Sequence, residues 1–193
     1  MTMEEVKERL LKGCFSVVPF YRWSTDSLNK IDEKAGYTNG THKLFFPAGA
    51  QDFIDYFHER LDALVVEEMK LKKVEGVRSS IFNALSIRFG EYQKHRAFTV
   101  ISHQYLSMPQ HIFFGKKLAW RTVDSIWTNI AMDKSTDFNY YTKRGLLLCV
   151  YNLASLYWIS DESVDFADTK DFIVRRLDDT VTIGKKVKSI FGA

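Results

Sequence analysis

The chain has 193 residues, of which 46% are apolar and 15% aromatic, and its formal net charge is only +3. This length fits one domain, or one domain with a small N-terminal module, and it is sufficient to bury a sizeable hydrophobic core. The small net charge excludes a chain that binds polyanions over its whole surface, and no apolar run reaches the ~18 residues that a transmembrane helix needs.

The opening of the chain predicts two helices. Apolar residues spaced by four, four and three positions indicate a helix over residues 4–20 that Pro19 helps to end. The residues of this stripe are Val6, Leu10, Cys14 and Val17. Ser24 or Thr25 can cap a second, shorter helix, which Gly36 stops.

A third short segment, residues 38–46, completes a pattern that resembles the helix-turn-helix head of TetR-type transcription regulators. The likeness rests on Ala35-Gly-x-Thr-x-Gly-Thr41 and on Phe46-Pro47. Regulators bind DNA through basic and polar side chains, but residues 1–50 hold seven Lys or Arg against six Asp or Glu. Lys43 is the only basic side chain in the recognition segment. We therefore expect a vestigial module over residues 1–50 that binds no nucleic acid, with a TetR-type ligand-responsive regulator as the alternative function.

The middle of the chain predicts four further helices. They cover residues 51–73, a stretch that starts near residue 75, residues 93–106 and residues 116–130, with a break at Met108-Pro109. The stretch 75–121 holds seven Lys and Arg against two Glu, a net charge of +5. This charge is either a solvated face or an attraction to an anionic membrane surface or an acidic partner, and the pattern leaves both open.

Residues 133–144 read Asp-Lys-Ser-Thr-Asp-Phe-Asn-Tyr-Tyr-Thr-Lys-Arg and begin with helix-start chemistry. The side chains that can accept from first-turn N–H groups are Asp133, Ser135, Thr136 and Asp137. An apolar stripe at helical spacing then runs as far as Trp158. Its residues are Phe138, Tyr141, Thr142, Gly145, Cys149, Asn152, Leu153 and Leu156. From spacing alone, a helix start followed by aromatic residues in a core accounts for this stretch. A last helix is expected to begin near residues 165–168.

The run 133–144 resembles the signature of the ninth protein of the coenzyme Q (Coq) biosynthetic set, a family described as lipid-binding accessory proteins of ubiquinone biosynthesis. The following block, residues 161–176, resembles the same family, and the likeness is dense over residues 118–184. The family usually has Trp where this chain has Tyr140. The resemblance implies an all-α, TetR-like helical bundle of about nine helices, in which a helical lipid-binding bundle over residues 51–193 follows the N-terminal module.

The resemblance also implies a function. It predicts a ubiquinone biosynthesis accessory protein that binds a polyprenylated quinone precursor, or another lipid, and presents it to the di-iron quinone hydroxylase at the membrane surface. A homodimer is expected, because TetR-type bundles often pair. The residues assigned to partner binding are Asp137, Tyr140, Tyr141 and Arg144. The residues assigned to lipid binding are Trp120, Trp127, Phe138, Leu146, Val150 and Leu153, each of which also fits ordinary core packing.

The end of the chain predicts a membrane contact. Residues 183–191 hold three lysines and no acid beside apolar residues, which suits a membrane interface, with a frayed basic tail as the alternative. The residues assigned to this short amphipathic tail are Lys185, Lys186, Val187, Lys188, Ile190 and Phe191. The first six residues have the character of neither a secretory signal nor a mitochondrial transit peptide. We therefore expect a cytoplasmic protein of bacterial type, peripheral to the inner membrane.

The sequence offers no catalytic constellation. A ferritin-like di-iron site needs two Glu-x-x-His pairs and two further Glu residues, and no Glu-x-x-His occurs here. The glycine-rich nucleotide loops and the Gly-x-Ser-x-Gly elbow are also missing from the sequence. We therefore expect no catalytic residue, no metal site and no cofactor, and we expect that the protein is not itself an enzyme.

Overall fold

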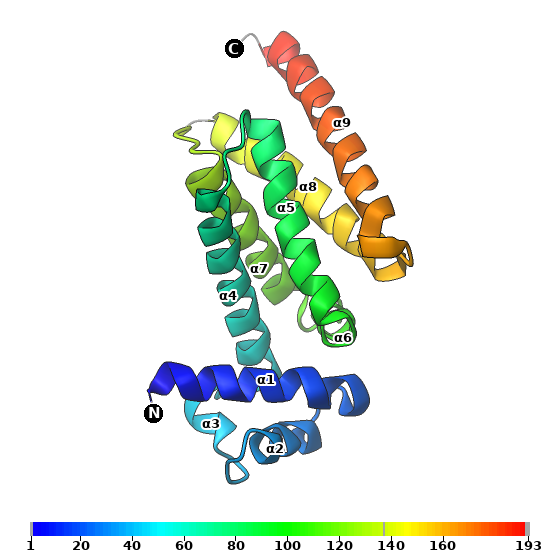
Figure 1. Cartoon of the computed structure of the whole chain (residues 1–193). Helices are drawn as coiled ribbons and strands as arrows, with labels where there is room; N and C mark the ends of the chain where they lie inside the picture. Colours follow the sequence, from blue (N-terminus) through cyan, green and yellow to red (C-terminus); the bar gives the residue numbers. More distant parts are fainter. Residues whose placement is uncertain (1, 137, 192–193) are drawn as a thin grey trace. The chain divides into compact units, whose positions relative to one another are not determined.

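The computed structural model describes residues 2–136 and 138–191, apart from the side chains of Phe138 and of residues 183–191 (Figure 1). Every regular element in this part of the chain is helical. The α-helices are α1 (Met3–Tyr21), α2 (Thr25–Lys34), α3 (His42–Phe45), α4 (Ala50–Leu71), α5 (Val77–Lys94), α6 (Arg96–Leu106), α7 (Ile112–Ser125), α8 (Phe138–Ser160) and α9 (Ala167–Phe191). A π-helix, η1 (Ile126–Ile130), and a 3-10 helix, η2 (Val164–Phe166), complete them. The predicted all-α fold of about nine helices is confirmed, and its helix content is consistent with a TetR-like bundle.

The chain divides into two compact units. Unit 1 consists of Met1–Leu61 and Lys94–Gly115, and unit 2 consists of Asp62–Gln93 and Lys116–Ala193. The predicted boundary at residue 50, between the N-terminal module and the helical bundle, stays a prediction. None of the helices described here is both long enough and apolar enough to cross a lipid bilayer.

In unit 1, α1 buries the stripe that the sequence predicts. Its four residues Val6, Leu10, Cys14 and Val17 are all buried. Thr2 begins the helix with a capping box, in which its side chain and that of Glu5 each accept from the other residue's backbone N–H. The predicted helix over residues 4–20 is confirmed to within one residue at each end, since α1 ends at Tyr21, two residues after Pro19. Pro19 lies in the last turn, where its missing N–H removes a single helical hydrogen bond.

The short helices of unit 1 are tied together by one buried carboxylate. Asp32, on α2, accepts from the backbone N–H of Gly40 at 2.7 Å and from that of His42 at 2.8 Å. The same carboxylate lies 2.7 Å from His42 Nδ1. His42, the first residue of α3 and part of the expected recognition segment, is therefore buried against α2, whereas Leu44 is 80% exposed. This helix presents an apolar side chain outward where a DNA-reading helix needs polar ones.

In unit 2, α8 supplies a continuous buried face. Its buried apolar residues are Leu147, Val150, Tyr151, Ala154 and Trp158. Trp158 meets two aromatic rings of α5, with centroids 6.3 Å from Phe89 and 5.6 Å from Tyr92. The next helix, α9, turns back and packs along α8, as Figure 1 shows. The expected stripe from Phe138 is therefore wrong as a core face: the five residues Tyr141, Cys149, Asn152, Leu153 and Leu156 are exposed, and only its end at Trp158 is buried.

The turn between α8 and α9 depends on Asp161. Its carboxylate accepts from the backbone N–H groups of Ser163 and Thr169, each at 2.8 Å, and from both hydroxyl groups. Burial alone would raise the pKa of Asp161, but these hydrogen bonds outweigh it and lower the pKa to about 2. Thr169 is the third residue of α9, so Asp161 satisfies one of the free N–H groups at the start of that helix. The second block of the family resemblance, residues 161–176, therefore contains the cap that begins α9.

Candidate functional site

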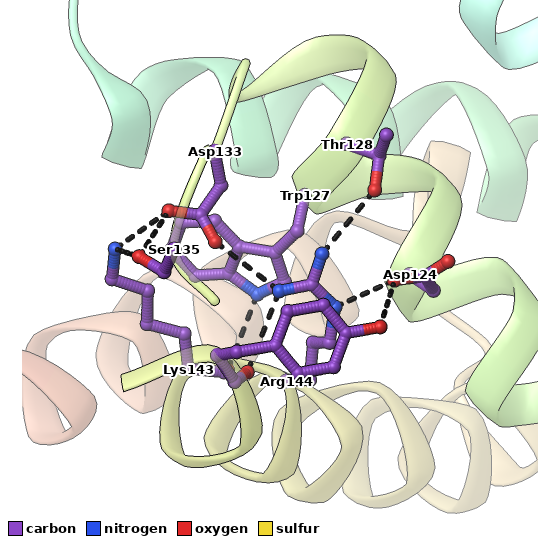
Figure 2. Close-up of polar contacts among 8 residues, drawn as sticks. Asp124, Trp127, Thr128, Asp133, Ser135, Lys143 and Arg144 are labelled. Atoms are coloured by element: carbon purple, nitrogen blue, oxygen red, sulfur yellow. Dashed lines mark hydrogen bonds and ion pairs between the residues drawn. The ribbon is translucent and has the colours of Figure 1, made fainter. Parts of the chain in front are cut away.

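Arg144 is the centre of a polar cluster formed by the end of α7, the π-helix η1, the segment after it and α8 (Figure 2). Its side chain is only 2% exposed. Its Nε donates to Asp124 Oδ1 at 2.6 Å, its Nη1 to Asp133 Oδ2 at 3.1 Å and its Nη2 to Thr128 Oγ1 at 3.2 Å. One planar guanidinium thereby joins three chain segments to α8, a geometry that a lysine cannot reproduce.

Asp133 is the most heavily bonded carboxylate of this cluster. Its Oδ1 accepts from Lys143 Nζ at 2.7 Å and from Ser135 Oγ at 2.8 Å, while its Oδ2 accepts from Arg144. Burial alone would raise the pKa of Asp133, but the hydrogen bonds from Lys143, Ser135 and Arg144 outweigh it and lower the pKa to about 2. The carboxylate is therefore ionised throughout the physiological pH range and compensates the buried guanidinium.

The two adjacent tyrosines of the signature have different surroundings. The Tyr140 hydroxyl donates to Asp124 Oδ1 at 3.1 Å, and this hydrogen bond raises the pKa of Tyr140. Arg144 lies over the Tyr140 ring, 3.5 Å from its centroid. Tyr141 is 65% exposed, and its ring meets that of Tyr140 edge to face at 5.0 Å. Tyr140 therefore belongs to the cluster, and Tyr141 stands on its outer side.

The π-helix η1 forms one wall of the cluster. It continues directly from α7, and its closing bond runs from the N–H of Ala131 to the carbonyl of Ile126 at 2.9 Å. Trp127 donates its indole N–H to the carbonyl of Lys143 at 3.2 Å, and the Lys143 ammonium lies 5.7 Å from the Trp127 ring centroid. Short π-helical turns are rare and frequently mark functional sites.

The structure accounts for the predicted partner residues individually. Tyr141 is accessible, whereas Arg144 is buried and engaged inside unit 2, so Arg144 can act on a partner only by positioning its neighbours. Asp137 lies outside the described residues. Asp133 and Ser135, expected as helix caps, hydrogen-bond to Lys143 and to each other, and α8 begins only at Phe138. Partner binding at this surface stays a prediction.

The predicted lipid-binding residues do not share one environment. Val150 is buried; Trp120, Trp127 and Leu146 are half-buried; and Leu153 is exposed. The side chain of Phe138 lies outside the described residues. The same holds for the membrane-contact residues Lys185, Lys186, Val187, Lys188, Ile190 and Phe191, of which only the helical backbone of α9 is described. Lipid binding and membrane contact by these residues stay predictions.

A second polar cluster, centred on Arg88, was not foreseen from the sequence. Arg88 on α5 is 1% exposed and donates to Asp62 Oδ1 at 2.6 Å. Its Nε lies 3.0 Å from the hydroxyl of Tyr92 and 3.2 Å from that of Tyr151, and the two hydroxyls are 2.6 Å apart. Thr122 donates to the same Asp62 oxygen at 2.9 Å. Arg88 was expected to contribute to a surface charge over residues 75–121, and that interpretation is wrong for this residue.

The Arg88 cluster is closely packed. It borders a cavity of about 10 Å³, which is close to the space that one water molecule needs. Burial raises the pKa of Tyr92 well above its usual value, so its hydroxyl stays protonated. The spacing of Arg88 and Tyr92, four residues apart on one helix, is the sequence signal that could have indicated this cluster. Nothing in the sequence alone indicates that Tyr151 contacts them. Within the described part of the chain, no three His, Cys, Asp or Glu residues gather as metal ligands.

Comparison with known proteins extends the signature. The COQ9 family model matches residues 114–184, the part of the chain that contains α8 and the Arg144 cluster. The chain is 28% identical to the rat (Rattus norvegicus) protein named ubiquinone biosynthesis protein COQ9, mitochondrial, over 97% of this chain and 62% of the relative. It is 27% identical to the human (Homo sapiens) protein of the same name, over 97% and 61%. With the probable coq9 of Dictyostelium discoideum it shares 27% identity, over 92% and 60%.

These relatives correct one expectation. The chain spans about three fifths of the length of the curated relatives it matches. All three are named as mitochondrial, so the expectation of a bacterial-type cytoplasmic protein at an inner membrane is wrong. That expectation rested on the first six residues of this sequence. Because the relatives are longer than this chain, those residues carry no information about a targeting sequence. The family-model match and the relatives together confirm the likeness that the signature predicted: this chain is related to the COQ9 proteins of ubiquinone biosynthesis.

Proposed function

We propose that this protein acts in ubiquinone biosynthesis, in mitochondria, as an accessory protein rather than as the catalyst of a step. The names of its curated relatives support the pathway and the compartment. The match to the family model in residues 114–184 supports it further, because this segment contains every residue of the Arg144 cluster. The observation that carries the proposal is this cluster, in which Asp133, Tyr140 and Arg144 of the signature meet Asp124 and Thr128.

In its finer form, the proposal is that the protein binds a polyprenylated quinone intermediate and presents it to the di-iron hydroxylase at a membrane. An isoprenoid tail needs shelter, because each exposed CH₂ group costs about 0.8 kcal/mol in water. Unit 2 offers an apolar face on α8, with Leu147, Val150 and Ala154 buried along it. A lipid tail between such helices would contact these apolar side chains in place of the contacts that they make with one another, so the apolar surface would stay covered.

The partner surface is proposed around Tyr141. This side chain is accessible, and it stands beside Tyr140, which the Asp124 hydrogen bond and the Arg144 stacking hold in place. Tyrosine is among the residues that contribute most to binding energy at interfaces, because a large ring immobilises few rotatable bonds. A tyrosine on a rigid base binds without the loss of conformational freedom that a mobile one would suffer.

Lipid binding is tested by extracting the purified protein with organic solvent and analysing the extract by mass spectrometry. A prenylated quinone precursor is expected in this extract and not in that of an unrelated helical protein purified from the same cells. If the extracts match, the carrier function is excluded for the protein as it is isolated.

Partner binding is tested with Tyr141→Ala. The affinity for the purified di-iron hydroxylase should fall by about tenfold or more, as expected for an interface hot spot. Tyr21→Ala is the matched control, because Tyr21 is a half-exposed tyrosine on α1 in unit 1. The helical circular dichroism of both variants should equal that of the unchanged protein. Equal affinities for the two variants would remove Tyr141 from the interface.

A further inference from the structure

The turn between α6 and α7, in unit 1, exposes three apolar side chains. Phe113 is 81% exposed, and Met108 and Ile112 are exposed beside it in the sequence. Met108, Ile112 and Phe113 are called the apolar corner below. A group of large apolar side chains facing water is unfavourable unless something covers it, and such groups mark sites of association.

The apolar corner is held by a well-packed turn. The His111 ring stacks on Tyr105 with centroids 4.1 Å apart, and its Nδ1 lies 2.9 Å from Gln51 Nε2. Gly115 allows α7 to approach α6 closely, since a Cβ atom there would lie 3.3 Å from the Cβ of Leu106. These contacts fix the turn from its inner side, and the corner side chains remain outside.

The positive charge of the segment around the apolar corner indicates an anionic partner. Residues 92–123 contain five Lys or Arg and no Asp or Glu. On α7, Lys116 and Lys117 are exposed and follow Ile112 and Phe113 by four residues, so that they stand one helical turn behind the apolar side chains. Apolar tips backed by lysines match a bilayer interface, in which acyl chains lie beneath anionic headgroups.

We propose that the apolar corner inserts into the surface of a membrane that contains anionic lipid, with Lys116 and Lys117 at the level of the headgroups. The long stems of these lysines allow the ammonium groups to stay in the polar layer while Phe113 enters the apolar one. The inference deepens the proposed function, on which it rests for the need to work at a membrane. It adds a contact independent of the predicted tail at residues 185–191.

Insertion is tested by tryptophan fluorescence at the corner. Phe113→Trp is compared with Leu44→Trp, because Leu44 on α3 is exposed to the same extent in the same unit. Vesicles contain equal parts of phosphatidylserine and a phosphatidylcholine brominated on its acyl chains. The emission that Phe113→Trp adds to the native tryptophans should be quenched, and the emission that Leu44→Trp adds should not. Equal quenching of the two, or none at either, overturns the proposal.

Affinity is tested by sedimentation with vesicles of the same two lipids without bromine. Phe113→Ser should weaken binding about tenfold, as expected for one large apolar side chain that leaves an interface. Lys116→Glu with Lys117→Glu should weaken it at least as much, and the binding of Leu44→Ser should equal that of the unchanged chain. Vesicles of phosphatidylcholine alone should bind all of them weakly. Unchanged vesicle binding by Phe113→Ser contradicts the proposal. If that variant binds vesicles normally but no longer binds the hydroxylase, the apolar corner is a protein contact and the proposal is likewise contradicted.

The two levels of the proposal fail separately. The prenyl lipid in a solvent extract reports the carrier function, and the quenching of Phe113→Trp reports the corner. A protein that yields no prenyl lipid but shows quenching at the corner retains this inference and loses the carrier function. A protein that yields the lipid and shows no quenching retains the carrier function and loses this inference.

Discussion

Arg144 and Tyr140 share one acceptor: the Arg144 Nε and the Tyr140 hydroxyl both donate to Asp124 Oδ1, at 2.6 and 3.1 Å. The guanidinium carbon also lies over the Tyr140 ring, 3.5 Å from its centroid. The stacking and the hydrogen bonds therefore support each other. A tryptophan, usual in the family at this position, keeps the aromatic face toward the guanidinium. The departure at Tyr140 thus leaves the stacked pair intact and adds a hydroxyl donor.

Arg144→Ala should destabilise the protein by about 3 kcal/mol, because it removes one of the two cations that bond to the buried carboxylate of Asp133 and leaves Asp124 without its guanidinium partner. Arg144→Lys should recover only part of this loss, since an ammonium cannot reach Asp124, Asp133 and Thr128 together. Urea unfolding followed by circular dichroism measures both. Arg175→Ala, an exposed arginine on α9, is the control and should change the free energy of unfolding little. A loss of similar size in Arg175→Ala would show that charge alone, not the cluster, matters.

The protein should lose stability in acid between about pH 4 and pH 2. Asp133 and Asp161 each have a folded-state pKa of about 2, below the ~3.9 of an unfolded aspartate. A lowered carboxyl pKa stabilises the fold above the unfolded value, and this contribution disappears as the pH falls through the folded one. Each residue should contribute about 2 kcal/mol.

Asp161→Asn should therefore be less stable than the unchanged protein at neutral pH and nearly equal to it at about pH 2. Urea unfolding across this range tests the expectation. Asn152→Ala, on the exposed side of α8, removes no titrating group and should run parallel to the unchanged protein at every pH. A constant difference between Asp161→Asn and the unchanged protein would contradict the assigned pKa.

Tyr92→Phe and Tyr151→Phe should each cost about 1 kcal/mol of stability, since each removes one hydroxyl from a buried hydrogen-bonded set. The double variant should cost clearly less than the sum, because the two hydroxyls bond to each other and to Arg88. A double-mutant cycle in urea gives the coupling. If the two costs add strictly, the two hydroxyls act independently. That outcome would contradict the hydrogen bond at 2.6 Å between them.

Two glycines inside helices should respond to alanine in opposite directions. At Gly13 on α1, a Cβ atom would lie 3.1 Å from the carbonyl oxygen of Ile31, so Gly13→Ala must push α1 and α2 apart, at a cost of about 1–3 kcal/mol. At Gly145 on α8, no atom lies within 4 Å of the added Cβ. Gly145→Ala should therefore stabilise the protein by roughly 0.5–1 kcal/mol through helix propensity alone. Thermal melts of the two variants should shift to opposite sides of the unchanged protein, and a shift in the same direction would refute the packing argument.

The helices were predictable because their apolar spacing is a local property. The stripe on α1 is buried as expected. On α8 the helix is present, but its buried face is Leu147, Val150, Ala154 and Trp158, and most of the predicted stripe is exposed. The polar clusters were less accessible to prediction, because they depend on residues that meet only after folding. Asp133 looked like a helix cap, but its hydrogen bonds go to Lys143, Ser135 and Arg144. Arg88 looked like surface charge because no local pattern indicates that Asp62 will lie 2.6 Å from it.

The π-turn at η1 makes the length of this segment a structural requirement. Its five residues, Ile126–Ile130, contain one residue more than an α-helical turn can hold without widening. Deleting one of them would restore the ordinary winding and rotate everything that follows by about 100°. The hydrogen bond between Asp133 and Arg144 would then be lost, although every side chain of the cluster was still present. Insertions and deletions between Asp124 and Arg144 should therefore be tolerated far less well than substitutions at the outer face of the same turn.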